Sequence, residues 1–243
     1  MTWKIAEFGW VRQLKPVIAV AYVLLIALFA WTIGQFYIPG KGFTALIVFG
    51  DKLEPISKVS HVDYFVERYS GGYDAQFYAQ IAMDPSLQNK ALKRAVDALA
   101  YRARRILFCA TAYAFGLGDP PRILQVYALQ NAFCWLGLAF LLLHWFPPVT
   151  WNNFLRWAGV LLSFGVCVSA RYALVDGPSL LLIVLGVFLL EKQRPWMATV
   201  GMAFGGLGKE TNLLAAAARV PEGKWDTKTW GRAVLRGLLV AGP

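Results

Sequence analysis

PVIAVAYVLLIALFAWTIGQFYIPG, residues 16–40, is a run without a charged side chain. A transmembrane helix needs roughly 20 apolar residues to cross about 30 Å of hydrocarbon, so residues 16–38 are predicted to form a first membrane span. Further uncharged runs follow at residues 106–118, 123–155, 157–170, 177–190 and 195–208. Lipid offers the backbone no hydrogen-bond partners, so such runs are stable there as helices. The pattern predicts an all-α polytopic membrane protein built as a transmembrane helix bundle.

The composition separates the chain from soluble proteins. Hydrophobic residues make up 58% of the 243 residues and charged residues only 16%, whereas a soluble domain usually carries about 25% charged residues. One short apolar run could be a buried helix of a soluble protein, but the repetition of such runs in a short chain argues against that reading. The composition therefore favours a multi-pass membrane protein.

Charge and cysteine content narrow the range of partners. A net charge of +10 would suggest nucleic acid in a soluble protein, but no basic and aromatic stripe resembles such a surface, so no nucleic acid is expected. Cytoplasmic basic residues and contact with the phosphates of the lipid bilayer explain the charge better. Cys109, Cys134 and Cys167 lie in apolar runs without a CxxC motif, which predicts packing rather than a disulfide or zinc site.

The chain is predicted to form one membrane domain with its N-terminus in the cytoplasm, because Lys4, Arg12 and Lys15 precede the first span. Its successive parts are a cytoplasmic tail at 1–15, the span at 16–38, an extracytoplasmic loop at 39–105, a bundle of short transmembrane helices at 106–220, and a polar loop with the start of a truncated span at 221–243. The last apolar segment is too short to cross, so the chain is expected to be a fragment of a longer protein.

Two lines of reasoning place Asp176 on opposite sides of the membrane. The basic connector at residues 191–195 is expected in the cytoplasm, which places Asp176 outside. If the arms at 106–118, 123–146 and 157–170 all cross the membrane, however, Asp176 ends inside. One of these three arms must therefore be re-entrant, or the connector is misassigned.

The loop at 39–105 holds seven of the chain's 14 acidic residues, and a loop of this length is rarely structureless unless it is functional. A helix is expected from Asp74 to Met83, ended by a turn at Asp84-Pro85. A second helix is expected between Lys90 and Ile106, with apolar residues on one side and mostly basic ones on the other. Both are predicted to be juxtamembrane helices that lie on the bilayer surface.

GGYDAQFY, residues 71–78, is the most distinctive stretch of this loop. Its two glycines permit a tight or left-handed turn before a helix. Asp74 is then either a simple N-cap or a carboxylate at the membrane edge that acts as a general base or metal ligand. The neighbouring aromatic residues, Tyr69, Tyr73, Phe77 and Tyr78, suit either an interfacial belt or a sugar-stacking platform.

Three charged segments border or interrupt the apolar runs. YRARR at 101–105 is either an interfacial anchor or a clamp for a lipid-linked phosphate, since guanidinium groups bind phosphate bidentately. RYALVDGP at 171–178 places charges near the membrane, where they usually mark a pathway, a pair or a site; a simple Arg171–Asp176 pair is the alternative. KET at 209–211 is either functional for the same reason or a water-exposed turn.

Four short segments carry a family resemblance: GYDAQFY (72–78), YRARRIL (101–107), RYALVDGPSLLL (171–182) and GGLGKETNLL (205–214). With the first span and long loop, they resemble the N-terminal part of GT-C superfamily membrane glycosyltransferases, the mannosyl-, arabinosyl- and aminoarabinose-transferases of bacterial membranes. The resemblance covers most of residues 16–214. The chain departs from the family in that Asp74 stands without an adjacent acid, and complete members are much longer.

The resemblance implies a multi-pass protein of the cell inner membrane that transfers a sugar, with inversion, from a polyprenyl-phosphate donor to an extracytoplasmic acceptor. Asp74 would accept the proton of the acceptor hydroxyl, and basic side chains would stabilise the phosphate leaving group. The implied substrate-binding residues are Tyr73, Gln76, Tyr78, Arg102, Arg104, Arg105, Arg171, Asp176, Lys209 and Glu210. A divalent metal is compatible with such proteins, although the sequence shows no recognisable ligand set.

Two other functions are open at the level of sequence. A transporter or flippase for a lipid or small polar solute would use the same charges as a pathway, and internal repeats, which would support it, are not found in the chain. A non-catalytic membrane subunit would use the long first loop to bind a partner protein. The donor sugar, the acceptor and any protein partner are not specified by the sequence.

Overall fold

The computed structural model describes residues 15–210, 212 and 231. Most of the tail at 1–15, Thr211, residues 213–220 of the predicted bundle, and the polar loop and truncated span at 221–243, apart from Gly231, lie outside these residues. The elements in chain order are α1 (Pro16–Gly34), η2 (Thr44–Leu46), β1 (Phe49–Gly50), α2 (Ser57–Ser60), β2 (Val66–Glu67), α3 (Ala75–Ala82), α4 (Leu92–Ala95), α5 (Leu99–Ala103), α6 (Ile106–Phe115), α7 (Pro120–Leu142), α8 (Trp151–Leu161), α9 (Phe164–Arg171), α10 (Asp176–Glu191) and α11 (Pro195–Gly208).

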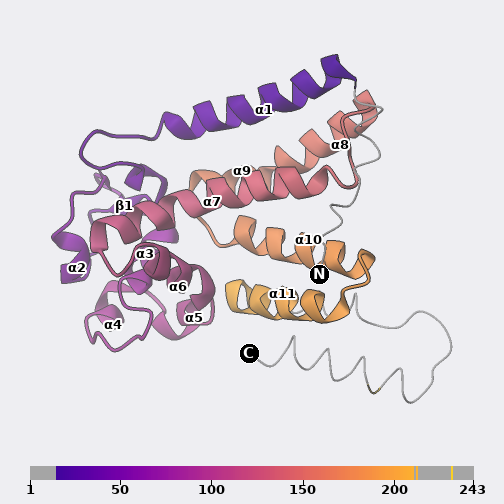
Figure 1. The fold of residues 1–243 in the computed structure, drawn as a ribbon. Coiled ribbons are helices and arrows are strands. Elements are labelled where there is room, and N and C mark those ends of the chain that lie inside the picture. Colours follow the sequence, from indigo (N-terminus) through magenta and orange to yellow (C-terminus); the bar gives the residue numbers. More distant parts are fainter. Residues whose placement is uncertain (1–14, 211, 213–230, 232–243) are drawn as a thin grey trace.

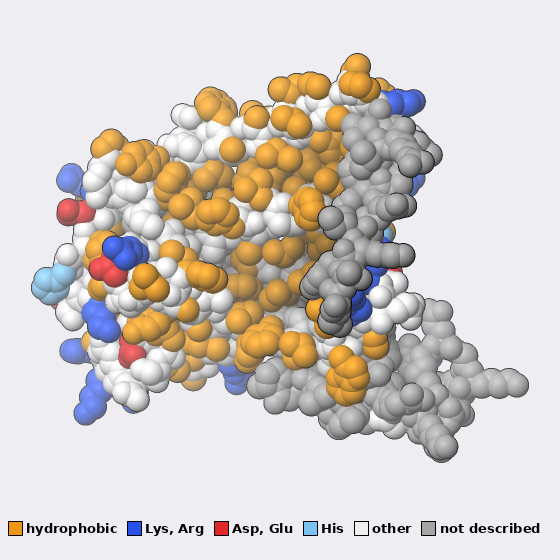
Figure 2. Space-filling view, in the orientation of Figure 1, with side chains coloured by type: hydrophobic (Ala, Val, Ile, Leu, Met, Phe, Trp, Pro, Cys, Tyr) orange, Lys and Arg blue, Asp and Glu red, His pale blue; other side chains and the backbone are white. Residues whose placement is uncertain are grey.

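The long helices run side by side, and the shorter elements gather at one end of them (Figure 1). Helices α1 and α7 are long and apolar enough to cross a membrane, and α8 with α9, bent by 49° at their junction, forms a third candidate span. Figure 2 shows hydrophobic side chains over the middle of the visible face, with charged ones gathered over the short elements at its left edge. The described residues are thus mostly helical, with two or three candidate spans.

The first span begins and packs as its sequence suggests. Pro16 occupies the first turn of α1, where its missing N–H removes no helical hydrogen bond. Much of the helix surface is exposed, including Val20, Leu24 and Leu28, as expected for a helix that faces lipid. The buried side is fixed by aromatic contacts: the Phe29 ring stacks on Trp135 of α7 with centroids 3.8 Å apart.

Helix α6 is shorter than a membrane span requires. It contains only 10 residues, about 15 Å at 1.5 Å per residue, too short to cross. A turn with positive φ at Leu117 and Gly118 then leads directly into α7, beside which α6 lies (Figure 1). By its length, the arm at 106–118 is therefore not among the candidate spans of the described residues. As a result, the loop at 39–105 and the start of α10 lie at the same end of the helices.

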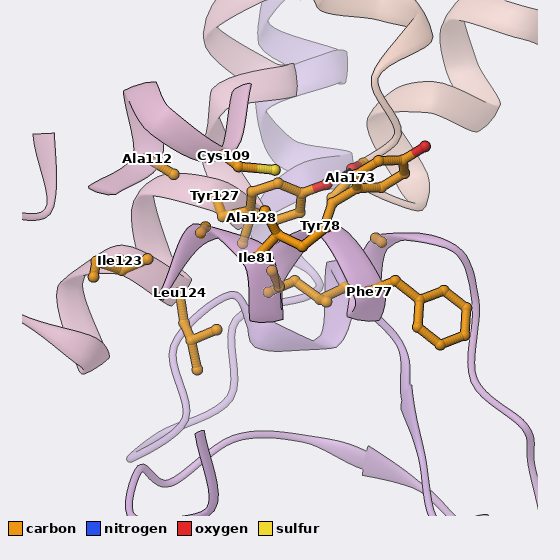
Figure 3. Close-up of a cluster of buried hydrophobic side chains, with 14 of the residues drawn as sticks. Phe77, Tyr78, Ile81, Cys109, Ala112, Ile123, Leu124, Tyr127, Ala128 and Ala173 are labelled. Atoms are coloured by element: carbon orange, nitrogen blue, oxygen red, sulfur yellow. Dashed lines mark hydrogen bonds between the residues drawn. The ribbon is translucent and has the colours of Figure 1, made fainter. Parts of the chain in front are cut away.

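Helix α3 corrects the prediction of a helix lying on the bilayer surface, because all eight of its residues are buried. Tyr78 and Ile81 lie toward side chains of α6 and α7, whereas the Phe77 ring points away from them (Figure 3). Its polar side is satisfied internally: the amides of Gly50 and Ile56 donate to the carboxamide oxygens of Gln76 and Gln80, at 3.1 and 3.0 Å. Helix α3 is the core of the loop rather than an amphipathic surface helix.

The second predicted juxtamembrane helix is also corrected, because it is broken into α4, α5 and the start of α6. Val96 has extended backbone angles, φ −119° and ψ 127°. The Asp97 carboxylate then accepts a hydrogen bond from the Ala98 amide at 2.7 Å, so a side chain competes for a backbone donor that a continuous helix would use. This break turns Asp97 toward Arg102 rather than outward as part of a polar helix face.

Candidate functional site

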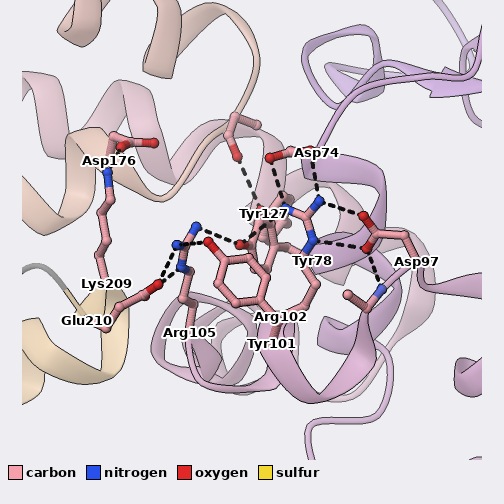
Figure 4. A network of polar contacts seen from close by, with 12 residues as sticks. Asp74, Tyr78, Asp97, Tyr101, Arg102, Arg105, Tyr127, Asp176, Lys209 and Glu210 are labelled. Atoms are coloured by element: carbon pink, nitrogen blue, oxygen red, sulfur yellow. Dashed lines mark hydrogen bonds and ion pairs between the residues drawn. The ribbon is translucent and has the colours of Figure 1, made fainter.

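A network of charged side chains lies where the short elements meet the ends of α10 and α11 (Figure 4). Arg102 comes from α5, and Arg105 stands just before α6. Asp176 is the first residue of α10, while Lys209 and Glu210 directly follow α11. Residues more than 100 positions apart in the chain are thus in direct contact. We call the group Asp74, Tyr78, Asp97, Arg102, Arg105, Asp176, Lys209 and Glu210 the polar network.

Arg102 is the buried centre of the polar network. Its side chain is only 7% exposed and binds two carboxylates at once. Its terminal nitrogens lie 2.8 and 2.9 Å from the two oxygens of Asp74, while Nε and Nη2 lie 3.0 and 2.8 Å from those of Asp97. Burial lowers the pKa of Arg102, but hydrogen bonds to Asp97 and Asp74 outweigh it and raise the pKa above its ordinary value. Arg102 is therefore a permanent cation that orients both carboxylates.

The Asp74 side chain is not a helix cap. Although Asp74 occupies the N-cap position of α3, its carboxylate accepts no capping hydrogen bond. It turns to Arg102 instead, and 52% of the side chain is exposed. The result is a carboxylate held on one side by a buried guanidinium and open to solvent on the other, as a group that receives a proton from a bound molecule requires.

The Tyr78 hydroxyl links the two arginines. It accepts hydrogen bonds from Arg102 at 3.4 Å and from Arg105 at 3.1 Å. Burial of the ring raises the pKa of Tyr78, and the two cations oppose this rise without cancelling it. Tyr78 consequently stays neutral and holds the two guanidinium groups at a fixed spacing.

Two ion pairs join the loop to the ends of the last helices. Arg105 binds Glu210 through two parallel bonds, Nε to Oε2 at 2.8 Å and Nη2 to Oε1 at 2.6 Å, and also donates to the Tyr101 hydroxyl. Hydrogen bonding to Arg105 lowers the pKa of Glu210 to about 2. Lys209 pairs with Asp176 at the start of α10. These pairs bring the separate charged segments of the sequence into one site.

The turn that presents Asp176 is built from buried polar groups. The Asn131 amide donates to the Leu174 carbonyl at 2.8 Å. The Ser169 hydroxyl donates to the Asn131 side-chain oxygen at 2.9 Å and accepts from the Gly177 amide at 2.7 Å. A β-carbon on Gly177 would lie 2.9 Å from the Asn131 oxygen, closer than real contacts allow. Gly177 is therefore required for close packing beside the acid.

The remaining predicted residues have different positions. Tyr73 stacks on Tyr172, with centroids 4.6 Å apart, next to Asp74 in sequence. Arg171 forms no pair with Asp176; it donates to the Ala45 carbonyl at 3.3 Å and covers the Phe36 ring. Arg104 is exposed and makes no side-chain contact with the described part of the network.

Gln76 is a further predicted substrate-binding residue that the structure places away from solvent. Its side chain is 2% exposed, and its amide donates to the Gly71 carbonyl at 2.7 Å. Both ends of the carboxamide are thus used to hold the loop before Asp74. Gln76 positions that loop instead of reaching a ligand directly.

Two members of the site were missed by sequence reasoning. Asp97 was assigned to a polar helix face, and Tyr101 was treated only as part of a basic segment. The one sequence signal is the Asp97–Arg102 spacing of five residues, which does not align on a continuous helix and becomes a pair only because the helix breaks between them.

A largely apolar cavity of about 440 Å³ adjoins the network at Asp176. Its lining begins at the bend between α8 and α9, around Ser163 and Phe164, and follows α9 to Leu174, Asp176 and Gly177. An apolar chain lying in this cavity would therefore have a polar end group next to the Lys209–Asp176 pair.

The charges of the polar network nearly balance. Arg102, Arg105 and Lys209 contribute three positive charges, and the carboxylates of Asp74, Asp97, Asp176 and Glu210 contribute four negative ones, a formal sum of −1. Every cation already has a carboxylate partner. An anionic ligand would therefore bind by displacing a carboxylate from Arg105 or Lys209.

No metal-binding group of three or more His, Cys, Asp or Glu side chains occurs within residues 15–210, 212 and 231. Comparisons of the chain with protein-family models, curated proteins and solved structures gave no match.

Proposed function

We propose that the protein is a membrane glycosyltransferase that transfers a sugar from a polyprenyl-phosphate donor to a hydroxyl acceptor outside the cytoplasm. The observation that carries the proposal is the half-exposed Asp74 carboxylate, which is held by buried Arg102. The Tyr78 hydroxyl in turn links Arg102 to Arg105. Such a site offers a proton acceptor and basic groups side by side, the two functions that sugar transfer from a phosphate needs.

In this proposal Asp74 accepts the proton of the acceptor hydroxyl as the oxygen attacks the anomeric carbon. The bond from that carbon to the phosphate oxygen breaks, and the electron pair leaves with the phosphate. Arg102 does not bind substrate, because both of its sides are used by Asp74 and Asp97. It keeps the Asp74 carboxylate oriented toward the open side of the site.

Arg105 and Lys209 are the proposed phosphate ligands. Arg105 offers a planar fork that now grips Glu210 bidentately, and a phosphate presents oxygens in the same arrangement. Lys209 is held by the half-exposed Asp176. The leaving phosphate would replace these carboxylates, and until then the ion pairs keep the basic groups ordered.

The cavity beside Asp176 supports a lipid-linked rather than a free sugar phosphate. It is mostly apolar and ends at the network, which matches a donor with an apolar chain and a charged head. The stacked pair of Tyr73 and Tyr172 directly precedes Asp74 in the chain through Tyr73 and offers a surface on which a sugar ring could stack.

The test is a transfer assay with the full chain in proteoliposomes, using short-chain polyprenyl-phosphate sugars carrying a radiolabelled hexose or pentose. The expected result is release of polyprenyl phosphate and labelled product, reduced at least 100-fold in Asp74→Asn. Glu67→Gln, an exposed carboxylate of the same loop, is the matched control. Full transfer by Asp74→Asn would exclude the base, and movement of the donor across the bilayer without chemical change would indicate transport instead.

A further inference from the structure

Two adjoining cavities share no lining residue with the polar network. The first, of about 560 Å³, is lined almost wholly by apolar groups of α6 and α7, including Leu129 and Phe133. The second, of about 590 Å³, contains Lys41, Asp63 and Arg122. The two share Phe115, Gln125 and Val126 as lining residues, so they adjoin, and we call the first the apolar half and the second the charged half of this space.

The two halves are stacked along the axis of α7. The charged half surrounds the start of the helix at residues 121–126, and the apolar half follows it to Phe133 and Cys134. From Gln125 to Phe133 the helix rises about 12 Å, at 1.5 Å per residue. Phe133 is 68% exposed, so the apolar half opens sideways. A membrane lipid beside a spanning helix has the same order, with its head at the surface and its chain below.

Gln125 fixes the charged half in place. Its side-chain oxygen accepts from the Phe43 amide at 2.8 Å, and its amide donates to the Lys41 carbonyl at 3.0 Å. These bonds tie the turn at residues 40–43 to α7. Gly42 has φ 60° in this turn, and a β-carbon there would collide with the Gln125 side chain. The backbone that carries Lys41 is therefore held rigidly against the first turns of the helix.

The charged half contains groups of both signs with unused binding capacity. Neither the Lys41 ammonium nor the Asp63 carboxylate has a hydrogen-bond or ion-pair partner within residues 15–210, 212 and 231, whereas Arg122 is paired with Asp119 at 3.5 Å. A simple phosphate would suit Lys41 but not the neighbouring carboxylate. A headgroup with both a phosphate and an N–H donor satisfies Lys41 and Asp63 together.

We infer that this space binds one membrane phospholipid with a primary ammonium headgroup, such as phosphatidylethanolamine, with its phosphate at Lys41, its ammonium at Asp63 and an acyl chain along α7. The site is independent of the proposed sugar transfer, because none of its lining residues belongs to the polar network. A bound lipid would fill the gap between α6 and α7 and stabilise the short helix that supports Arg105.

The experiment is a native mass spectrometry titration of the delipidated full chain in detergent with phosphatidylethanolamine, phosphatidylcholine and phosphatidylglycerol. Phosphatidylethanolamine is expected to bind at least fivefold more tightly than the other two, since choline lacks N–H donors and glycerol lacks the cation. Asp63→Asn should abolish that preference, and Lys41→Gln should weaken binding of all three. Lys52→Gln, an exposed lysine of the same loop, is the matched control and should bind as the unmodified chain does.

Two further variants test the apolar half. Val126→Phe narrows the passage between the cavities, and Phe133→Ala removes an exposed ring from the groove without disturbing the core. Each is expected to lower phosphatidylethanolamine affinity at least fivefold. The inference is overturned if the unmodified chain does not prefer phosphatidylethanolamine, or if Asp63→Asn and Phe133→Ala both bind it with unchanged affinity.

Discussion

The Arg105–Glu210 pair gives the sharpest prediction about stability, because it is the direct link between the loop and the end of α11. Two bonds of 2.8 and 2.6 Å join the side chains. A Glu210 pKa lowered from 4.5 to about 2 corresponds to an upper limit of about 3 kcal/mol, at 1.36 kcal/mol per unit. The Glu210 side chain is 36% exposed, so solvent screening reduces the expected contribution to about 1–2 kcal/mol.

The pair is tested with a double-mutant cycle of Arg105→Gln, Glu210→Gln and the double variant. The free energy of unfolding is measured in detergent by denaturant titration with tryptophan fluorescence. Each single variant should be less stable than the unmodified chain. The cycle should give a coupling energy of about 1–2 kcal/mol, because the second substitution breaks no further ion pair once the first has removed it. The substitution of Arg105 also removes its hydrogen bonds to Tyr78 and Tyr101. This loss occurs in the single and the double variant alike, so it cancels in the coupling energy.

The pH dependence has a definite sign. A carboxyl group whose pKa is lowered on folding contributes stability that is fully present above its unfolded value and is lost as the pH falls through the folded value. The difference between the unmodified chain and Glu210→Gln should therefore be constant from pH 7 to about pH 5 and shrink from pH 4.5 toward pH 2. A coupling below about 0.3 kcal/mol, or a difference that grows on acidification, would refute the reasoning.

Two other predictions concern the turn at Asp176 and its sidedness. Gly177→Ala should destabilise the protein by about 1–3 kcal/mol, because the added carbon meets the Asn131 oxygen at 2.9 Å; Gly159→Ala, where nothing lies within 4 Å, should leave stability unchanged or raise it by up to about 1 kcal/mol. Both are read from thermal unfolding in detergent. In a cysteine-free background, single cysteines replacing Asp176 and Lys192 should react with a membrane-impermeant thiol reagent from opposite sides, Asp176→Cys from outside. Labelling from one side would contradict the predicted placement of Asp176 outside and of the connector at residues 191–195 in the cytoplasm.

Several features of the fold could be predicted from the sequence because their cause is local. The uncharged run at 16–40 predicts a helix from its own composition, and α1 occupies Pro16–Gly34. Pro120 and Pro121 mark the first turn of α7, and Asp119 caps it by accepting from the Arg122 amide at 3.3 Å. Such signals depend on neighbours within a few residues, so they can be read without the tertiary structure.

The assembly of the polar network could be anticipated only in part. Asp74 was singled out by the stretch GGYDAQFY, Arg102 and Arg105 as an anchor or phosphate clamp, and Glu210 as a charge that interrupts an apolar run. Which charge pairs with which partner could not be read, because the pairing depends on how helix ends meet. The expected alternatives, an Asp74 cap and an Arg171–Asp176 pair, are both local contacts, and both gave way to long-range ones.

By itself, the sequence determined which segments are helical and apolar enough to span a membrane, since desolvation of the backbone acts on each segment separately. The tertiary structure alone decided that α3 is buried and that the helix between Lys90 and Ile106 breaks. Both outcomes depend on a partner distant in sequence. Arg102 captures Asp97 and Asp74 together, and α6 and α7 cover α3, so no local pattern could have specified them.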